Sequence, residues 1–170
     1  DLTRYTKATA TKWGKRPPPE ELDRLGRMHL IRTSTRVSGM EQLRDFISAG
    51  FGITSCGSQS FSSVRDENGV SRRTRAGWSH AMSLLAFDSR PTTLERYPRC
   101  GGGLGLLVNS WGKNWIRGSR KILGTNLLIP HGSFWAQWSD IKHRSFYAMS
   151  SAMAQRHGQS LSTLYIQKKI

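Results

Sequence analysis

Two polar side chains at the ends of predicted strands could perform proton-transfer chemistry. His80 lies early in the strand predicted over residues 77–87, and Asn109 follows the apolar strand predicted over residues 104–108, in the turn Asn109-Ser110-Trp111-Gly112. An imidazole can activate a thiol, provided that a further polar group fixes the tautomer and the angle of its ring. A buried strand histidine is the alternative interpretation of His80, and a core aromatic residue is the alternative for Trp111.

The elements that must position these residues are predicted from hydropathy and turn signals. Helices are expected over residues 20–28 and 40–49, the second with an apolar face at helical spacing and Gly50 as its stop signal. Strands are expected over residues 30–37, 51–55, 77–87, 104–108 and 132–138, and a third helix over residues 146–156. Between them we expect a polar serine-rich stretch over residues 56–63, a turn over 65–69, and loops over 71–75 and 90–103. These elements predict an α+β fold in which antiparallel strands dominate after residue 50.

The length of 170 residues favours one domain with extensions, since a chain of this length can bury a substantial core. Residues 1–39 are expected to form a basic lead-in and a short helix, residues 40–143 the β-rich domain, and residues 144–170 a C-terminal helix and a basic tail. The chain begins at Asp1 rather than at a methionine, and we therefore expect it to be processed or to be part of a longer polypeptide.

Four features resemble, in their order, the second half of a papain-like cysteine peptidase. The first is the helix over residues 40–49 with Gly50, followed by the strand Phe51-Gly52-Ile53-Thr54-Ser55-Cys56, which looks like the family's G-P-V-S-V strand. The second is the strand that begins Trp78-Ser79-His80-Ala81-Met82, and the third is the turn Asn109-Ser110-Trp111-Gly112. The fourth is Gly132-Ser133-Phe134-Trp135, which looks like the family's closing G-Y-x-x strand. The resemblance covers about residues 40–140 and extends to uncharacterised bacterial and phage proteins with peptidase-like folds. It implies a papain-like fold, represented mainly by its antiparallel β-rich half with a few helices.

The resemblance implies a role for each matching residue. His80 corresponds to the general base and Asn109 to the residue that orients its ring, while Trp111 shields their contact. The cleft and supporting residues are Trp78, Gly112 and Gln59. The implied activity is thiol-dependent hydrolysis of an amide in a peptide or protein substrate, with no cofactor.

The nucleophile is not in the family's usual place. In the family it lies upstream, at the N-terminus of a long helix within a motif like C-G-S-C-W, and no cysteine precedes Cys56 in this sequence. Aligning Cys56-Gly57-Ser58-Gln59 with that motif puts Gln59 at the nucleophilic position, and a glutamine cannot form a thioester. We favour the alignment that puts Cys56 at the end of the strand beside His80, because the preceding helix and Gly50 fit only that one; Cys56 then lines the cleft.

Three interpretations of the missing nucleophile remain open. The thiol is supplied by an N-terminal segment outside this chain, or Cys56 has taken over the role, or the fold has lost catalysis. The absent initiator methionine favours the first interpretation. An alternative function of a different class is a non-enzymatic structural or virion-associated protein built on a peptidase-like scaffold.

The net charge is the strongest compositional signal. Lys and Arg number 26 against 11 Asp and Glu, which gives +15, and residues 96–170 hold eleven basic residues against one acidic residue. Cationic side chains interleaved with aromatic ones can bind phosphate backbones and stack on bases, whereas a solvated basic face is the alternative interpretation. The candidate residues for binding nucleic acid or an acidic protein surface are Arg72, Arg73, Arg75, Lys113, Arg117, Arg120 and Lys121.

Composition disfavours several other classes of protein. Two cysteines cannot form a disulfide scaffold or a four-cysteine metal site, and the five histidines show no paired ligand spacing, so we expect no metal. No apolar run is long enough to span a membrane and no signal-peptide pattern is present, which favours an intracellular or virion-associated protein. Cys100 is expected to be an exposed loop cysteine.

Overall fold

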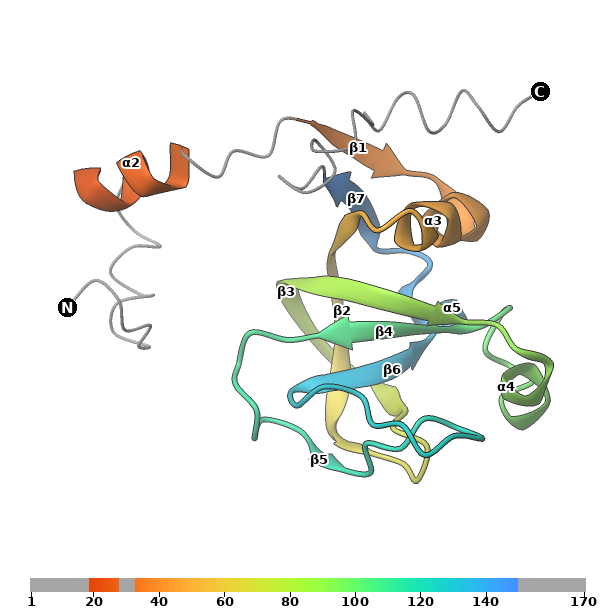
Figure 1. The fold of residues 1–170 in the computed structure, drawn as a ribbon. Helices are drawn as coiled ribbons and strands as arrows, with labels where there is room; N and C mark the ends of the chain where they lie inside the picture. The colour runs from red at the N-terminus through yellow and green to blue at the C-terminus, as the bar shows by residue number, and fades with distance from the viewer. Residues whose placement is uncertain (1–18, 28–32, 150–170) are drawn as a thin grey trace, which may run out of the picture.

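The computed structural model describes residues 19–27 and 33–149, in which short helices alternate with strands of very different lengths (Figure 1). In chain order the elements are α2 (Glu20–Arg27), β1 (Ser34–Val37), α3 (Gly39–Ser48), β2 (Gly52–Arg65), β3 (Ser71–Asp88), α4 (Pro91–Arg96), β4 (Leu104–Val108), β5 (Arg117–Gly118), β6 (Ser133–Gln137), α5 (Trp138–Ile141) and β7 (Ser145–Met149). The expectations for residues 1–18, 28–32 and 150–170 lie outside the described residues.

The strands form one curled sheet in the order β1-β7-β2-β3-β4-β6, and β5 pairs with β2 off this path. The pairings along the path are antiparallel, whereas β5 runs parallel to β2. The sheet curls into a half-barrel, and Val70, in the connection between β2 and β3, bridges to Trp135 of β6. The structure therefore confirms a mainly antiparallel β domain with short helices.

The β2–β3 hairpin is the longest feature of the fold, with strands of 14 and 18 residues. The Asp66 carboxylate accepts hydrogen bonds from the backbone N–H groups of Asn68 and Val70, both at 2.9 Å. Gly69 has a φ of +80°, a left-handed conformation that favours glycine. The reversal predicted at Asn68-Gly69 is confirmed.

The main hydrophobic core joins side chains of the sheet with those of α3 and α5. Phe134 of β6 is fully buried, and its ring lies 5.0 Å from that of Phe61 of β2. Helix α3 contributes Leu43 and Phe46 to the same core, and the Phe46 ring meets the Phe51 ring edge-on at 5.7 Å. The helix predicted over residues 40–49 and its apolar face are confirmed.

Two stretches that the sequence did not mark as strand belong to the hairpin. The serine-rich residues 56–63 lie within β2, and the residues 71–75, predicted as a loop, lie within β3. Residues 72–77 are exposed, so hydropathy carried no strand signal there. Backbone hydrogen bonds between β2 and β3 hold these residues in strand conformation, although their side chains are not buried.

Three further predictions were wrong. Residues 91–96, predicted as loop, form α4, which has Pro91 in its first turn. The helix expected from Phe146 is replaced over residues 145–149 by β7, where Phe146 and Ala148 are buried and their neighbours are less so. Cys100 is only 1% exposed, because it packs in a second apolar cluster with residues such as Leu104 and Trp135.

The sheet extends across both predicted domain boundaries. β1 precedes residue 40 and β7 follows residue 143, yet these strands pair with each other, and β7 also pairs with β2. Among the described residues, no helix has the length and apolar character needed to cross a membrane.

Candidate functional site

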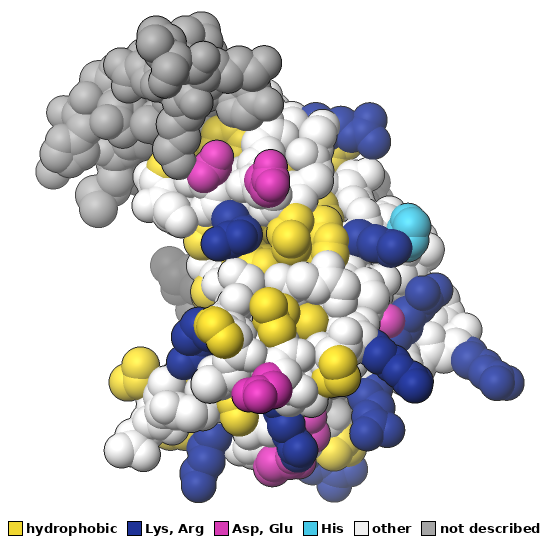
Figure 2. All heavy atoms as spheres, turned by 90° about the vertical axis from the view of Figure 1, so that its right-hand side faces the viewer, with side chains coloured by type: hydrophobic (Ala, Val, Ile, Leu, Met, Phe, Trp, Pro, Cys, Tyr) yellow, Lys and Arg dark blue, Asp and Glu magenta, His cyan; other side chains and the backbone are white. Residues whose placement is uncertain are grey.

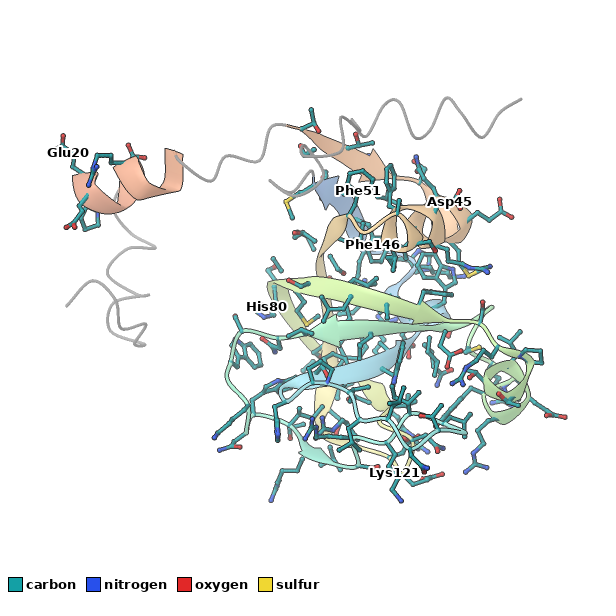
Figure 3. The ribbon with its side chains drawn as sticks, in the orientation of Figure 1. Glu20, Asp45, Phe51, His80, Lys121 and Phe146 are labelled. Carbon is teal, nitrogen blue, oxygen red and sulfur yellow. The ribbon has the colours of Figure 1, made fainter. Side chains whose placement is uncertain are left out.

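The pairing of β3 with β4 brings His80 and Asn109 together. Ser83 of β3 lies opposite Val108 of β4, so His80, which precedes Ser83, and Asn109, which follows Val108, meet where β4 ends, near the middle of β3. Figure 3 shows His80 at the end of the sheet away from α4. The His80 Nε2 and the Asn109 Oδ1 atoms are 2.8 Å apart. Since an amide oxygen can only accept, Nε2 carries the proton, and the lone pair of the neutral ring lies on Nδ1.

The Asn109 side chain is held in one orientation. It is 5% exposed, and its Oδ1 also accepts a hydrogen bond from the Trp111 backbone N–H at 3.3 Å. This second donor fixes which atom of the amide faces His80. The Asn109 Nδ2 group is buried and finds no acceptor among the described residues.

An aromatic column connects the site with the core. The Trp111 indole stacks on the His80 ring with centroids 4.9 Å apart and an angle of 30° between the planes. Trp115 meets Trp111 edge-on at 5.6 Å, donates from Nε1 to the Gly132 carbonyl at 2.7 Å, and packs edge-on against Phe134 at 5.6 Å. Trp111 therefore covers the imidazole from outside, although it is itself 54% exposed.

The turn that carries Trp111 depends on a glycine. Gly112 has a φ of +93°, and a Cβ added there would meet no atom within 4 Å. The requirement at Gly112 is therefore conformational rather than steric, since a left-handed φ disfavours other residues.

The predicted cleft residues on β2 are less closely engaged with His80. Cys56 is a half-buried free thiol that lies opposite Ala81 in the ladder, whereas Gly57 lies opposite His80. Because successive side chains of a strand alternate between the two faces, Cys56 shares the face of Ala81 and not that of His80. Gln59 lies opposite Gly77. Trp78 belongs to β3, and its side chain is outside the described part of the structure.

A hollow of about 360 Å³ adjoins Asn109. Small residues line it, namely Thr54, Ala81, Ser83, Val108 and Ser110 together with Met82 and Asn109. Ala81, Ser83 and Ser110 are exposed, so the hollow opens on an uncovered part of the sheet.

Arg144 is a residue of this site that the sequence did not indicate. It is 4% exposed, and its guanidinium donates a hydrogen bond to the His80 carbonyl at 2.8 Å. Arg144 lies directly before β7, in a region for which a helix was predicted nearby, and 64 residues separate it from His80. No local pattern links two positions so far apart, and only the β2–β7 pairing brings them together.

The structure places one basic cluster and Arg117 of the other on either side of β2. Arg72, Arg73 and Arg75 lie on the exposed part of β3, beside β2, and Arg117 lies on β5, which pairs with β2 through Val64. A cleft of about 620 Å³ is lined by residues that include Arg73, Arg75 and Asp140. Lys113 and Lys121 are exposed, whereas Arg120 is engaged with the Ile129 carbonyl and with His131. Figure 2 shows Lys and Arg side chains spread widely over one face of the molecule.

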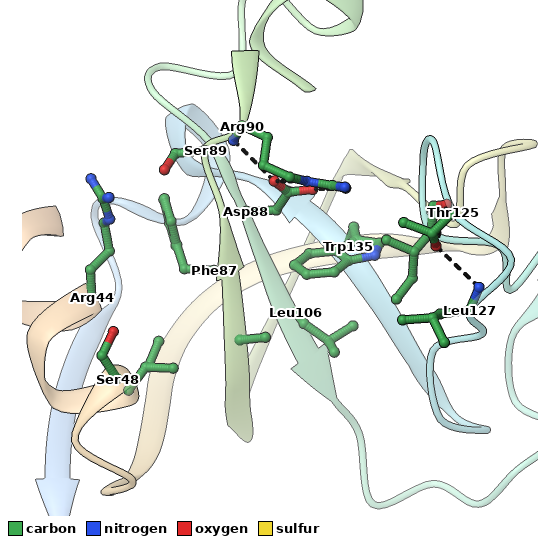
Figure 4. A pocket seen from close by; sticks show the side chains of 13 residues that line it. Arg44, Ser48, Phe87, Asp88, Ser89, Arg90, Leu106, Thr125, Leu127 and Trp135 are labelled. Carbon is green, nitrogen blue, oxygen red and sulfur yellow. Dashed lines mark hydrogen bonds and ion pairs between the residues drawn. The ribbon is translucent and has the colours of Figure 1, made fainter. Parts of the chain in front are cut away.

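A second hollow, of about 560 Å³, contains none of the predicted site residues (Figure 4). Its apolar side chains include Phe87, Leu106, Leu127 and Trp135, and Asp88 lies at its edge. Asp88 is 9% exposed and accepts hydrogen bonds from Arg90 Nε at 2.9 Å, Arg90 Nη2 at 2.8 Å and Thr93 Oγ1 at 2.8 Å.

Replacing Asp88 with asparagine should make stability less dependent on pH. Burial by itself raises the pKa of Asp88, but the hydrogen bonds from Arg90 and Thr93 outweigh it and hold the pKa below its usual value. A carboxyl with a lowered pKa stabilises the fold above the pKa of the unfolded chain, about 3.9, and loses this contribution as the pH falls through its folded value. We expect Asp88→Asn to lower the free energy of unfolding by about 1–2 kcal/mol at pH 7, and by less in acid.

Urea unfolding at pH 7 and in acid measures this difference. Glu95→Gln, an exposed change on α4, serves as the control and should have little effect at either pH. If Asp88→Asn lowers the free energy of unfolding by the same amount at both pH values, the ion pair with Arg90 does not cause the loss of stability.

The site consists of a hydrogen-bonded histidine–asparagine pair that an indole covers. Within the described residues, no group of His, Cys, Asp and Glu side chains is placed to hold a metal ion. No family model matches this chain, and no curated protein matches it.

Proposed function

We propose that this chain carries the histidine–asparagine half of a papain-like cysteine peptidase site, and that the thiol nucleophile comes from a segment outside the given sequence. The observation that carries the proposal is the 2.8 Å contact between His80 Nε2 and Asn109 Oδ1 under the Trp111 indole. The order of the elements around it, from helix α3 through β2, β3, β4 and β6, supports the same proposal.

The chemistry requires a proton acceptor of fixed orientation. A thiol that reaches Nδ1 of His80 transfers its proton to the ring, and the thiolate forms a bond to the carbonyl carbon of the substrate amide. The imidazolium then returns the proton to the amine nitrogen as the carbon–nitrogen bond breaks. Water, deprotonated by His80, cleaves the thioester and restores the thiol. Asn109 keeps the ring in the required tautomer, and Trp111 keeps solvent from their hydrogen bond.

The position of Cys56 favours an external thiol over Cys56 itself. Cys56 lies opposite Ala81, on the other face of the ladder from His80. Ala81 and Ser83 are exposed on the same face as Cys56, so an external thiol would have to approach His80 from the opposite face of the ladder.

Peptide hydrolysis combined with thiol alkylation tests the proposal. The protein in its natural full-length form is incubated with a fluorogenic peptide library, with and without iodoacetamide, and mass spectrometry identifies the alkylated cysteine. We expect hydrolysis that iodoacetamide abolishes, with the label on a cysteine other than Cys56 and Cys100. Label on Cys56 with loss of activity would make Cys56 the nucleophile, and the absence of any hydrolysis would overturn the peptidase proposal.

A second candidate function is nucleic-acid binding by the basic surface. The observation that favours it is the pairing of β2 with both β3 and β5, which carry Arg72, Arg73 and Arg117. Exposed arginines on two strands that flank a third can contact neighbouring phosphates of one duplex, but Arg72 and Arg73 are consecutive in β3 and point to opposite faces, so only one of them shares a face with Arg117. This function would suit a structural or virion-associated protein.

Binding to a fluorescent DNA duplex should weaken steeply as salt concentration rises. The triple variant R72Q/R73Q/R117Q is expected to reduce the slope of log K against log salt by about 0.9 for each phosphate that the protein no longer neutralises. Arg36→Gln, an exposed change on β1 away from these strands, is the control and should leave the slope unchanged. A flat salt response would contradict the proposal, and binding to an acidic polypeptide but not to DNA would assign the surface to a protein partner.

A further inference from the structure

A buried arginine reaches from the start of β7 across β2 to the backbone of His80. Arg144 Nη2 donates to the carbonyls of His80 and Ser55, at 2.8 and 3.1 Å. Its Nε donates to Ser55 Oγ at 2.7 Å, and its Nη1 donates to the Gln59 carbonyl at 3.2 Å. Every nitrogen of the guanidinium therefore has an acceptor, and these acceptors belong to two neighbouring strands.

The partners of Arg144 are neutral. Among the described residues, the acceptors given for Arg144 are backbone carbonyls, a serine hydroxyl and a glutamine amide, all uncharged. Burying a cation among uncharged acceptors is costly, and burial lowers the pKa of Arg144, although the nearby Cys56 thiol acts in the opposite direction. The hydrogen bonds of the guanidinium therefore hold this side chain in place. A guanidinium holds its donors in a rigid planar fork, which makes it suited to fixing several carbonyl groups relative to one another.

His80 lies at the point where the ladder between β2 and β3 becomes irregular. Gly57 pairs with His80, and the register then shifts before Gln59 pairs with Gly77. Beyond such an irregularity, regular backbone bonds no longer dictate where the strand lies. Arg144 binds carbonyls on both sides of the shift, those of His80 and Gln59.

We infer that Arg144 is a positioning residue for His80. By holding the His80 carbonyl, it fixes the main chain from which the imidazole projects, so that the ring meets Asn109 and Trp111. The consequence for catalysis rests on the proposed function, but the effect on the ring does not.

Gly57 provides space for this arrangement. A Cβ at Gly57 would lie 2.8 Å from Cγ of Arg144 and 2.5 Å from Oε1 of Gln59, which is closer than real Cβ contacts. Gly57→Ala is thus expected to displace the Arg144 side chain while leaving its charge in place. Gly52 of the same strand has no atom within 4 Å of such a Cβ, so Gly52→Ala is a matched control.

Nuclear magnetic resonance of the His80 ring tests the inference. The Trp111 indole should shift the His80 ring protons upfield, and the bond to Asn109 should slow exchange of the Nε2 proton with solvent. In Arg144→Lys, which keeps the charge and removes the fork, we expect more than about half of the upfield shift to disappear. We also expect the Nε2 proton to exchange at least about 10-fold faster, as for a hydrogen bond weakened by a factor of 10. Gly57→Ala should change both signals in the same direction.

Arg65→Lys is the control for a general loss of stability. Arg65, the last residue of β2, is buried like Arg144. Its guanidinium donates to the carbonyls of Ser133 and Gly118 and not to that of His80. Arg65→Lys should lower the melting temperature and change the His80 signals clearly less than Arg144→Lys does. Unchanged His80 signals in Arg144→Lys, or equal changes in Arg65→Lys, would overturn the inference. Altered signals in a protein that hydrolyses no peptide would uphold the inference and remove the peptidase proposal instead.

Discussion

Replacing His80 with alanine is expected to reduce kcat/KM for thiol-dependent peptide hydrolysis by about 10³-fold or more. The imidazole both removes the proton of the thiol and returns it to the leaving amine, and general acid–base catalysis of this kind contributes about 10²–10⁴-fold. Asn109→Ala should have a smaller effect in the same assay, because the base remains and only the 2.8 Å hydrogen bond that orients it is removed.

His131→Ala is the matched control for this prediction. His131 is exposed and contacts Arg120 rather than the β3–β4 end of the sheet. It should retain the activity of the unaltered protein. Hydrolysis that survives in His80→Ala, or falls equally in His131→Ala, would show that the peptidase activity does not depend on the site described above.

Phe134→Ala is expected to lower the free energy of unfolding by about 3–5 kcal/mol. The Phe134 ring is fully buried between Phe61 and Trp115, with centroids 5.0 and 5.6 Å away, so its removal leaves a cavity that the sheet cannot close. Since Trp115 in turn supports Trp111, the same change should loosen the indole that covers His80.

Urea unfolding followed by circular dichroism measures this loss. Leu127→Ala removes a comparable apolar side chain that is 66% exposed, and it should stay within about 0.5 kcal/mol of the unaltered protein. A loss below about 1 kcal/mol for Phe134→Ala, with an unchanged m-value, would contradict the placement of Phe134 at the centre of the core.

The apolar runs around Leu84 and Leu107 mark β3 and β4 in the sequence. That His80, Asn109 and Trp111 lie together was implied by the resemblance to papain-like peptidases, and the pairing of β3 with β4 gives the register that joins them. Their catalytic role stays a prediction. Helix α3 was predictable, since its apolar spacing and the glycine that ends it lie within one short segment.

The features that could not be predicted depend on partners distant in the sequence. The polar part of the β2–β3 hairpin is ordered by cross-strand bonds, which leave no trace in hydropathy. The apolar and polar residues of β7 alternate over too few positions for the sequence to distinguish a strand from a helix. The segment forms a strand because it pairs with β1 on one side and β2 on the other. The role of Arg144 follows from that pairing and was missed together with it.

The placement of β7 also bears on the order in which the fold can form. The hairpin of β2 and β3 closes around the turn at residues 66–69, so its contacts are local in sequence. β7, by contrast, pairs residue 149 with residues 34 and 52, and closing such long loops costs more entropy and takes longer. His80 therefore belongs to a hairpin that can form early in folding. Arg144, which binds the His80 carbonyl, takes its place only when β7 pairs with β1 and β2. Completion of the site is thus coupled to completion of the fold.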